Sequence, residues 1–403
     1  MQAFVARQPI LDRKRRLYAY ELLFRSGPQN VFTALDGQKA TGKVISDSLT
    51  VFGGKDFTRG RRAFINFPQD MLVQGYPRLL PKEWVVVEVL ETVEPTPAVI
   101  RALKELKAAG YTLALDDFVY HPRFRALLEL ADLVKVDLLA QDESALKDLV
   151  ATLRPYGMAL LAEKVETPQQ FKRCLRMGFS YFQGFFFSRP EVVAGRELPP
   201  QKLAHLQLLR EVNLPEISIS ELERIIKQDL SLSYKLLSYI NSAFFGLLQK
   251  VTSIRQAMTL LGQQNLRLWA SLLLMSSLAA DKPDELIVSS MMRARLCENL
   301  AKHVKLPSQS SDYFLLGLFS HIDAILDRPL AEAIAPLPLV EDIKAALLGQ
   351  HVPLRLVLET VEAYERGDWE GLALAAPVLG LDQELLPPLY AEALTWSQNA
   401  LSA

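Results

Sequence analysis

The chain has 403 residues, of which 50% are hydrophobic and 23% are charged, and its formal net charge is -1. A chain of this length predicts two domains, or one large barrel with an additional module. The near-zero charge disfavours a dedicated nucleic-acid-binding protein, because the affinity of such proteins rests on a basic surface.

The cysteines and apolar segments indicate the cellular compartment. Cys174 and Cys297 lie far apart in helix-like segments, which predicts buried thiols outside any disulfide and a reducing compartment. The N-terminal residues meet a charge too early for a signal peptide. The longest apolar stretch, near 269–280, contains serines and is too short to span a bilayer. We therefore expect a soluble, cytoplasmic protein without a membrane span.

The first half alternates short apolar runs with amphipathic helical segments. The runs cover 63–67, 84–90, 112–115, 133–136, 158–162 and 181–187, with helical segments such as 95–109, 143–153 and 168–177 between them. Gly110, Gly157 and Gly178 follow these helical segments, where left-handed C-caps are expected. Buried strands that are each followed by a helix predict a parallel sheet covered by helices, and six or seven such units favour a closed (β/α) barrel. The runs 4–11 and 17–24 around a charged turn predict a hairpin, and hence one antiparallel strand.

The strand pattern ends near residue 196, where Leu198-Pro-Pro200 marks the boundary between the halves. The periodicity downstream predicts helices at about 201–212, 219–227, 231–240, 253–259, 263–279, 285–303, 311–325, 328–334, 339–347, 354–365, 368–374 and 382–398. Ser218, Ser253 and Asp382 are the expected N-caps. The domains are therefore predicted as a barrel over 1–195 and an all-helical domain over 196–403.

Polar residues recur at the ends of the apolar runs, about one for each βα unit. They are Glu21, Asn66, Glu88, Asp116, Asp117, Lys135, Asp137, Glu163, Glu166 and Gln183. The carboxyl ends of the strands of a (β/α) barrel converge on one mouth, so these side chains are expected to meet there. A single charged residue at a strand end is more often a solvated loop residue. Its recurrence in strand after strand, where an unpaired charge is costly, favours a functional site.

This set predicts a metal site. Clustered carboxylates repel one another unless cations neutralise them. Ligands that are all oxygen suit Mg²⁺ or Mn²⁺, and paired ions suit phosphodiester hydrolysis, whereas the absence of His and Cys from the set disfavours zinc. The predicted ligands are Glu21, Asn66, Glu88, Asp116, Asp117 and Glu163.

The same segments resemble the EAL domain family over roughly residues 1–190. Tyr20-Glu-Leu-Leu-Phe-Arg25, Leu113-Ala-Leu-Asp-Asp-Phe118, Val134-Lys-Val-Asp137 and Leu161-Ala-Glu-Lys-Val-Glu166 carry the resemblance. It implies a barrel with one antiparallel strand that hydrolyses cyclic di-GMP to linear pGpG, with the six predicted ligands holding the metal ions.

The resemblance also implies roles for further residues. Lys135 and Asp137 would orient the attacking water, Glu163 would accept its proton, and Gln183 would lie near the active site. Arg25 would contact the phosphate of the ligand, with Leu22 and Gln183 beside it. Glu91 and Glu166 would brace the loop that follows Asp116 and Asp117.

Three departures from the EAL motifs bear on catalysis. Leu22 replaces an alanine, Lys164 replaces a glycine, and the loop Asp-Asp-Phe-Gly-Thr-Gly becomes Asp116-Asp-Phe-Val-Tyr-His-Pro122. Pro122 restricts the backbone of that loop. In active relatives the loop couples metal binding to dimerisation, so we expect weak, conditional or absent catalysis. A homodimer is left open.

Residues 225–243, 254–262 and 314–320 resemble the HDOD family, whose helical fold is shared with phosphohydrolases that use a His-Asp pair. The chain contains no His-Asp dipeptide, and His321-Ile-Asp323 is the nearest approach to one. His205, His303, His321 and His351 are predicted to be surface or helix-face residues rather than ligands. The resemblance thus implies a non-catalytic regulatory domain that binds an unidentified protein partner.

The order of the two domains resembles a bacterial two-domain signalling family that affects motility, pili or biofilm. Two alternatives to the phosphodiesterase stay open. One is a non-catalytic cyclic di-GMP receptor or scaffold, and the other is an unrelated barrel hydrolase that acts on another phosphodiester.

Overall fold

The computed structural model describes residues 4–25, 57–190, 198–214, 217–228, 230–241, 249–304 and 310–402. The chain divides into two compact units. The first holds residues 1–189 with 363–373, and the second holds 190–362 with 374–403. A domain boundary near residue 195 stays a prediction. No helix in the described ranges is long and apolar enough to cross a bilayer.

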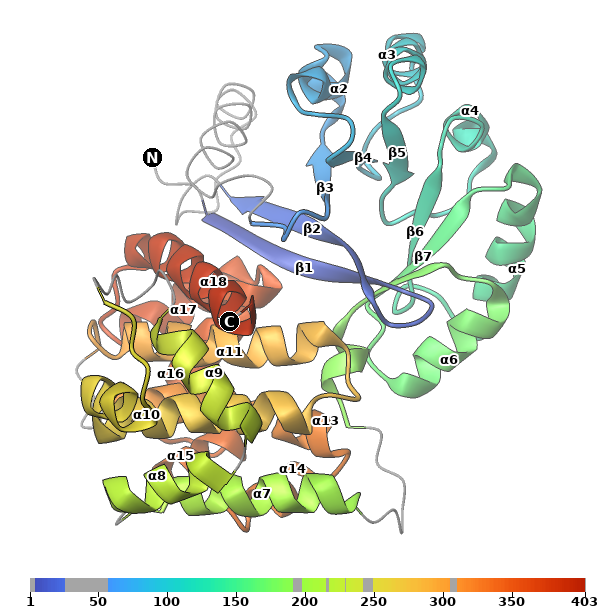
Figure 1. The fold of residues 1–403 in the computed structure, drawn as a ribbon. Helices are drawn as coiled ribbons and strands as arrows, with labels where there is room; N and C mark the ends of the chain where they lie inside the picture. Colours follow the sequence, from blue (N-terminus) through green and yellow to red (C-terminus); the bar gives the residue numbers. More distant parts are fainter. Residues whose placement is uncertain are drawn as a thin grey trace. The chain divides into compact units, whose positions relative to one another are not determined.

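The first unit is a closed barrel whose strands follow one another in chain order (Figure 1). The strands are β1 (Phe4–Asp12), β2 (Leu17–Arg25), β3 (Arg62–Phe67), β4 (Val85–Val89), β5 (Thr112–Leu115), β6 (Leu133–Asp137), β7 (Ala159–Glu163) and β8 (Tyr181–Gln183). β1 pairs antiparallel with both β2 and β8, whereas the other neighbours pair in parallel. The predicted barrel with one antiparallel strand is confirmed.

Helices connect the parallel strands. They are α2 (Gln69–Val73), α3 (Pro97–Ala108), α4 (Arg125–Leu128), α5 (Glu143–Leu153) and α6 (Pro168–Met177), with 3₁₀ turns at Tyr76–Leu79, Pro122–Phe124, Arg154–Tyr156 and Phe185–Ser188. The side chain of Thr167 accepts a hydrogen bond from the backbone of Gln170 and forms a capping box at the start of α6. The predicted C-caps are confirmed, since Gly110, Gly157 and Gly178 have φ of 91°, 71° and 100°.

The barrel interior is built in layers. One layer is a cluster of buried apolar residues, Ile10, Ala19, Phe64, Val86, Ala114, Leu133 and Leu161. Residues i and i+2 of a strand face the same side. In each strand, the residue two positions beyond the member of this apolar layer, towards the mouth, therefore also points inward. In β1, which runs the other way, this is the position two residues earlier. These positions form what we call the polar layer, which consists of Gln8, Glu21, Asn66, Glu88, Asp116, Lys135, Glu163 and Gln183.

The second unit is helical, as predicted. Its helices are α7 (Pro200–Val212), α8 (Ile219–Gln228), α9 (Leu230–Ile240), α10 (Ile254–Leu278), α11 (Asp284–Leu300), α12 (Ser310–Phe319), α13 (Ile322–Leu326), α14 (Leu330–Ile334), α15 (Glu341–Leu347), α16 (Pro353–Arg366), α17 (Trp369–Val378) and α18 (Leu386–Ser402), with a 3₁₀ turn at Gln383–Leu385. Residues 363–373, which include the end of α16 and the start of α17, belong to the first unit. Gly262 interrupts α10 with a φ of 74°, at the break predicted between two helices.

Close packing, buried cysteines and helix caps characterise the second unit. Gly317 of α12 lies against α11, because a Cβ at this position would be 2.4 Å from the backbone of Arg293. Cys297 of α11 is buried, as is Cys174 of α6 in the first unit, and neither forms a disulfide, as predicted. The predicted caps are also present, since Ser218 accepts from the backbone of Glu221 and Ser253 from that of Gln256.

Candidate active site in the barrel

Lys135 lies at the centre of the polar layer. Its side chain is 1% exposed, and its ammonium nitrogen approaches four carboxylates. The nitrogen–oxygen distances are 2.7 Å to Asp116, 2.8 Å to Glu88, 2.9 Å to Glu163 and 3.3 Å to Glu21. Residues of β2, β4, β6 and β7, with Asp116 directly after β5, therefore meet around one buried cation, as the strand-end pattern predicted.

A second set of contacts surrounds Glu21. The amide nitrogen of Gln183 donates to Glu21 at 2.6 Å and to Gln8 at 2.8 Å, and that of Asn66 donates to Glu21 at 3.3 Å. Sequence reasoning missed Gln8. The pattern that could have identified Gln8 is the alternation of inward- and outward-facing residues in β1, in which Gln8 lies two positions before the inward-facing Ile10.

Several oxygens of this site are buried without a hydrogen-bond partner. They are Oδ1 of Asn66, Oε2 of Glu88, Oδ1 of Asp117 and Oε2 of Glu163. A buried oxygen in this condition costs free energy unless a cation or donor satisfies it. Carboxylate and amide oxygens are the ligands that hard divalent cations take, so the donor set fits Mg²⁺ or Mn²⁺. Among the described residues, no three His, Cys, Asp or Glu side chains are grouped so that they could hold one metal ion.

Burial shifts the ionisation of the cluster. Loss of solvation raises the pKa of Glu88 well above its ordinary value, although Lys135 lowers it in part. The same cause raises the pKa of Asp116, and that of Glu163 to about 8. Burial alone would lower the pKa of Lys135, but the surrounding carboxylates hold it well above its usual range. Burial therefore favours the protonated forms of these acids, the acids favour the charged form of Lys135, and a bound cation would favour the ionised acids.

Two further acids lie beside the polar layer. Asp137, which pairs in register with Glu163 of β7, accepts hydrogen bonds from Nζ of Lys164 at 2.5 Å and from the backbone of Leu139 at 2.7 Å. Asp117 follows Asp116 with a φ of 38°. We call Asp117, Asp137 and Lys164 the rim.

Four other residues named from the sequence do not join the polar layer. Leu22 is the neighbour of Glu21 in β2 and so faces the opposite side of the strand. Arg25 is buried, and its guanidinium donates to the carbonyl oxygen of Trp369 at 3.1 Å. Glu91 is exposed beyond β4, and Glu166 lies 3.7 Å from a guanidinium nitrogen of Arg189.

The helical unit holds its own polar cluster around His321. His321 is buried rather than on the surface, and Nε2 lies 3.2 Å from Oγ of Ser289. Burial, with Arg293 nearby, holds the pKa of His321 well below its ordinary value. Arg293 approaches Oγ of Ser320 at 3.3 Å and Glu362 at 3.4 Å. The buried guanidinium and the loss of solvation thus both disfavour the charged form of His321.

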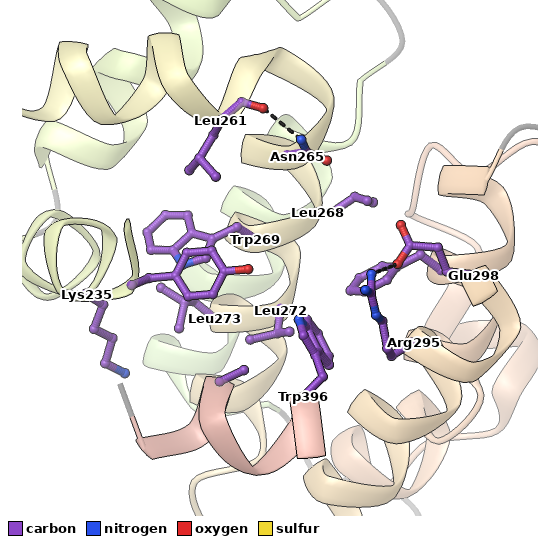
Figure 2. A pocket seen from close by; sticks show the side chains of 13 residues that line it. Lys235, Leu261, Asn265, Leu268, Trp269, Leu272, Leu273, Arg295, Glu298 and Trp396 are labelled. Carbon is purple, nitrogen blue, oxygen red and sulfur yellow. Dashed lines mark hydrogen bonds and ion pairs between the residues drawn. The ribbon is translucent and has the colours of Figure 1, made fainter. Parts of the chain in front are cut away.

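The helical unit also contains a cavity of about 170 Å³ (Figure 2). Its lining combines leucines with the aromatic side chains of Tyr239, Trp269, Phe314 and Trp396. Tyr239 stacks on Trp269 with ring centroids 6.4 Å apart. Arg295 lies on the other side of the cavity in Figure 2, where it pairs with Glu298 at 2.8 Å.

Comparison with known proteins agrees with this architecture. The EAL domain family matches residues 69–190, and the HDOD domain family matches residues 198–331. The cyclic di-GMP phosphodiesterase CdgJ of Vibrio cholerae is 39% identical over 399 residues, which cover 98% of this chain and 92% of that protein. The uncharacterized protein YuxH of Bacillus subtilis is 37% identical over 413 residues, which cover 100% of both chains.

Solved structures of EAL proteins are also similar to part of this chain. The EAL domain protein of Listeria monocytogenes is 23% identical, with a TM-score of 0.38, and covers 47% of this chain and 88% of its own. The YkuI protein of Bacillus subtilis, solved with cyclic di-GMP and calcium, is 20% identical, with a TM-score of 0.40, and covers 64% of this chain and 72% of its own. Because the match to CdgJ extends through both domains, this chain belongs to the family of bacterial signalling proteins in which an EAL domain is followed by an HDOD domain.

Proposed function

We propose that this protein acts in cyclic di-GMP signalling, and that its barrel hydrolyses one phosphodiester bond of cyclic di-GMP to give linear pGpG. The observation that carries the proposal is the polar layer, in which four carboxylates and Lys135 meet at one end of a closed barrel. The name of CdgJ, a cyclic di-GMP phosphodiesterase related over almost the whole chain, supports it.

The residues of the site suit metal-assisted hydrolysis. Mg²⁺ or Mn²⁺, when bound, would lower the pKa of water and offset negative charge on the phosphate. Glu21, Asn66, Glu88, Asp116 and Glu163 would hold the ions, with Asp117 beside them. The ammonium of Lys135 would orient the attacking water as a donor. Glu163, whose pKa burial raises to about 8 in the absence of metal, would release its proton when the ions bind, and could then accept one from the attacking water.

The remaining roles rest on the EAL motifs alone and stay predictions. Asp137 would help to orient the water, and Gln183 would position Glu21 through its 2.6 Å hydrogen bond. Arg25 and Leu22 would bind the nucleotide. Glu91 and Glu166 would brace the loop after Asp117.

We further propose that the helical unit is a non-catalytic regulatory domain. The sequence contains no His-Asp dipeptide, and Nε2 of His321 lies 3.2 Å from Oγ of Ser289 with Arg293 nearby. Its partner would be another protein, with an output in motility, pili or biofilm. A cytoplasmic location and a homodimer belong to the same proposal.

A second candidate is a cyclic di-GMP receptor that binds without hydrolysis. The loop that follows Asp117 favours it, because Val119 and Tyr120 are exposed and stand where the EAL motif has glycine and threonine, while Pro122 starts a 3₁₀ turn. Such a loop cannot follow a glycine-dependent backbone path.

One pair of measurements separates the two candidates. Purified full-length protein is incubated with cyclic di-GMP and Mg²⁺ or Mn²⁺, and linear pGpG is quantified by chromatography against Glu21→Ala. Product above this control supports the phosphodiesterase. Calorimetry with cyclic di-GMP and Ca²⁺ then follows, and micromolar binding without product supports the receptor. Neither binding nor product would refute both.

A further inference from the structure

Lys164 places a cation at the rim of the acidic site. Its ammonium nitrogen lies 2.5 Å from Oδ2 of Asp137, and the side chain of Asp137 is only 14% exposed. Asp117 and Glu163 also act electrostatically on this ammonium. The charge of Lys164 is therefore held among three acids of the site, although its own side chain is 50% exposed.

The backbone at this position is strained. Lys164 has a φ of 53°, a left-handed conformation that glycine adopts without cost and a lysine rarely adopts. Asp117 has a φ of 38° and is a second residue of this kind at the same rim. Two strained residues at one site indicate a constraint beyond folding.

The carboxylate of Asp117 has an oxygen that is available to bind a metal ion. Its Oδ1 is buried and has no hydrogen-bond partner, so the Lys164 ammonium acts on Asp117 through charge without a bond to this oxygen. A divalent cation on the Asp117 side of the site would therefore share its surroundings with a tethered positive charge. Lys135 pairs with acids on both sides of the site, since its ammonium nitrogen lies 2.8 Å from Glu88 and 2.7 Å from Asp116. The Asp117 side of the site therefore carries the positive charge of Lys164 in addition to that of Lys135.

We propose that Lys164 is a tethered cation that opposes binding of a second divalent ion at the Asp117 side, so that the protein holds one ion tightly and another at least tenfold more weakly. This inference rests on the proposed metal-binding role of the barrel. Lys164 would then be a positioning residue that determines how many metal ions the site holds. Hydrolysis would require a high concentration of metal.

Manganese stoichiometry tests the proposal without a catalytic readout. Equilibrium dialysis of the full-length protein against Mn²⁺ gives the number of sites and their affinities, and electron paramagnetic resonance detects spin coupling between neighbouring Mn²⁺ ions. The variants are Lys164→Asn and Lys164→Arg. Asparagine tolerates the left-handed backbone and removes the charge, whereas arginine retains the charge. Lys147→Asn, at an exposed ion pair of α5, controls for the loss of a remote cation.

The expected result is one tight Mn²⁺ in the wild-type, Lys164→Arg and Lys147→Asn proteins, and two ions with a coupled spectrum in Lys164→Asn. Two ions of equal affinity in the wild type, or one in Lys164→Asn, would overturn the proposal and leave the phosphodiesterase hypothesis standing. If no variant binds Mn²⁺, the metal-dependent function itself fails. Thermal unfolding of each variant shows that the comparison is made on folded protein.

Discussion

The ammonium of Lys135 lies 2.8 Å from a carboxylate oxygen of Glu88, and both side chains are buried inside the barrel. Removing this cation leaves buried carboxylates without compensation. We expect Lys135→Met to lower the free energy of unfolding by about 3–5 kcal/mol at pH 8, measured by urea denaturation. Lys147→Met, at an exposed i,i+4 pair with Glu143, should change it by less than about 0.5 kcal/mol. Equal effects of the two substitutions would contradict the central position of Lys135.

Metal binding should stabilise the fold through Glu88. A cation that binds only the folded state adds about 2.7 kcal/mol at a concentration one hundred times its Kd. We expect saturating Mn²⁺ to raise the melting temperature of the wild type and to leave that of Glu88→Gln almost unchanged. Glu105→Gln, which breaks an exposed pair with Arg78, should respond as the wild type does. An undiminished shift in Glu88→Gln would remove Glu88 from the ligand set.

The raised pKa of Glu163 predicts the pH dependence of the metal-free protein. The unfolded chain releases this proton near the ordinary glutamate pKa of 4.5, whereas the folded chain keeps it until about pH 8. Unfolding thus releases a proton between these values, so stability falls as pH rises through this window. The slope is at most about 1.4 kcal/mol per pH unit for one group. Glu163→Gln should flatten the decline in urea denaturation from pH 5.5 to 8, and an unchanged slope would contradict the assignment.

Gly184 follows Gln183 at a close approach of two backbone segments. Its φ is 133°, and a Cβ at this position would lie 2.3 Å from the carbonyl oxygen of Val165. Gly184→Ala should therefore lower the free energy of unfolding by more than about 3 kcal/mol and displace Gln183 from Glu21. Gly157→Ala is the matched control, since Gly157 has a φ of 71° and open space around it. It should cost about 1 kcal/mol, and chemical denaturation compares the two variants.

The spacing of apolar residues predicted most helices and strands, because these segments bury their residues in a regular pattern. α5 and α6 have the predicted bounds, and the run 133–136 became β6 with one added residue. The run 181–187 was only partly correct. β8 ends at Gln183, and residues 185–188 form a 3₁₀ turn, because Gly184 turns the backbone out of the sheet. Likewise the predicted helix 311–325 divides between α12 and α13 at His321, which has a non-helical ψ of 18°.

The members of the site were predictable, but several of their contacts were not. Strand ends identify which acids reach the mouth, and the structure brings Glu21, Glu88, Asp116 and Glu163 together. Sequence patterns do not determine side-chain torsions, so they did not predict the pairing of Lys164 with Asp137. The position of Arg25 beside Trp369 joins segments 344 residues apart, a contact that no local pattern encodes.

The placement of Lys135 has a consequence for how the protein matures. An interior lined only with acids would have to capture its ions before the barrel could close, and folding would then depend on metal supply. With an ammonium already among the carboxylates, the newly made chain carries its own counter-ion. We therefore expect the chain to fold without bound metal and to bind ions afterwards, as their concentration changes.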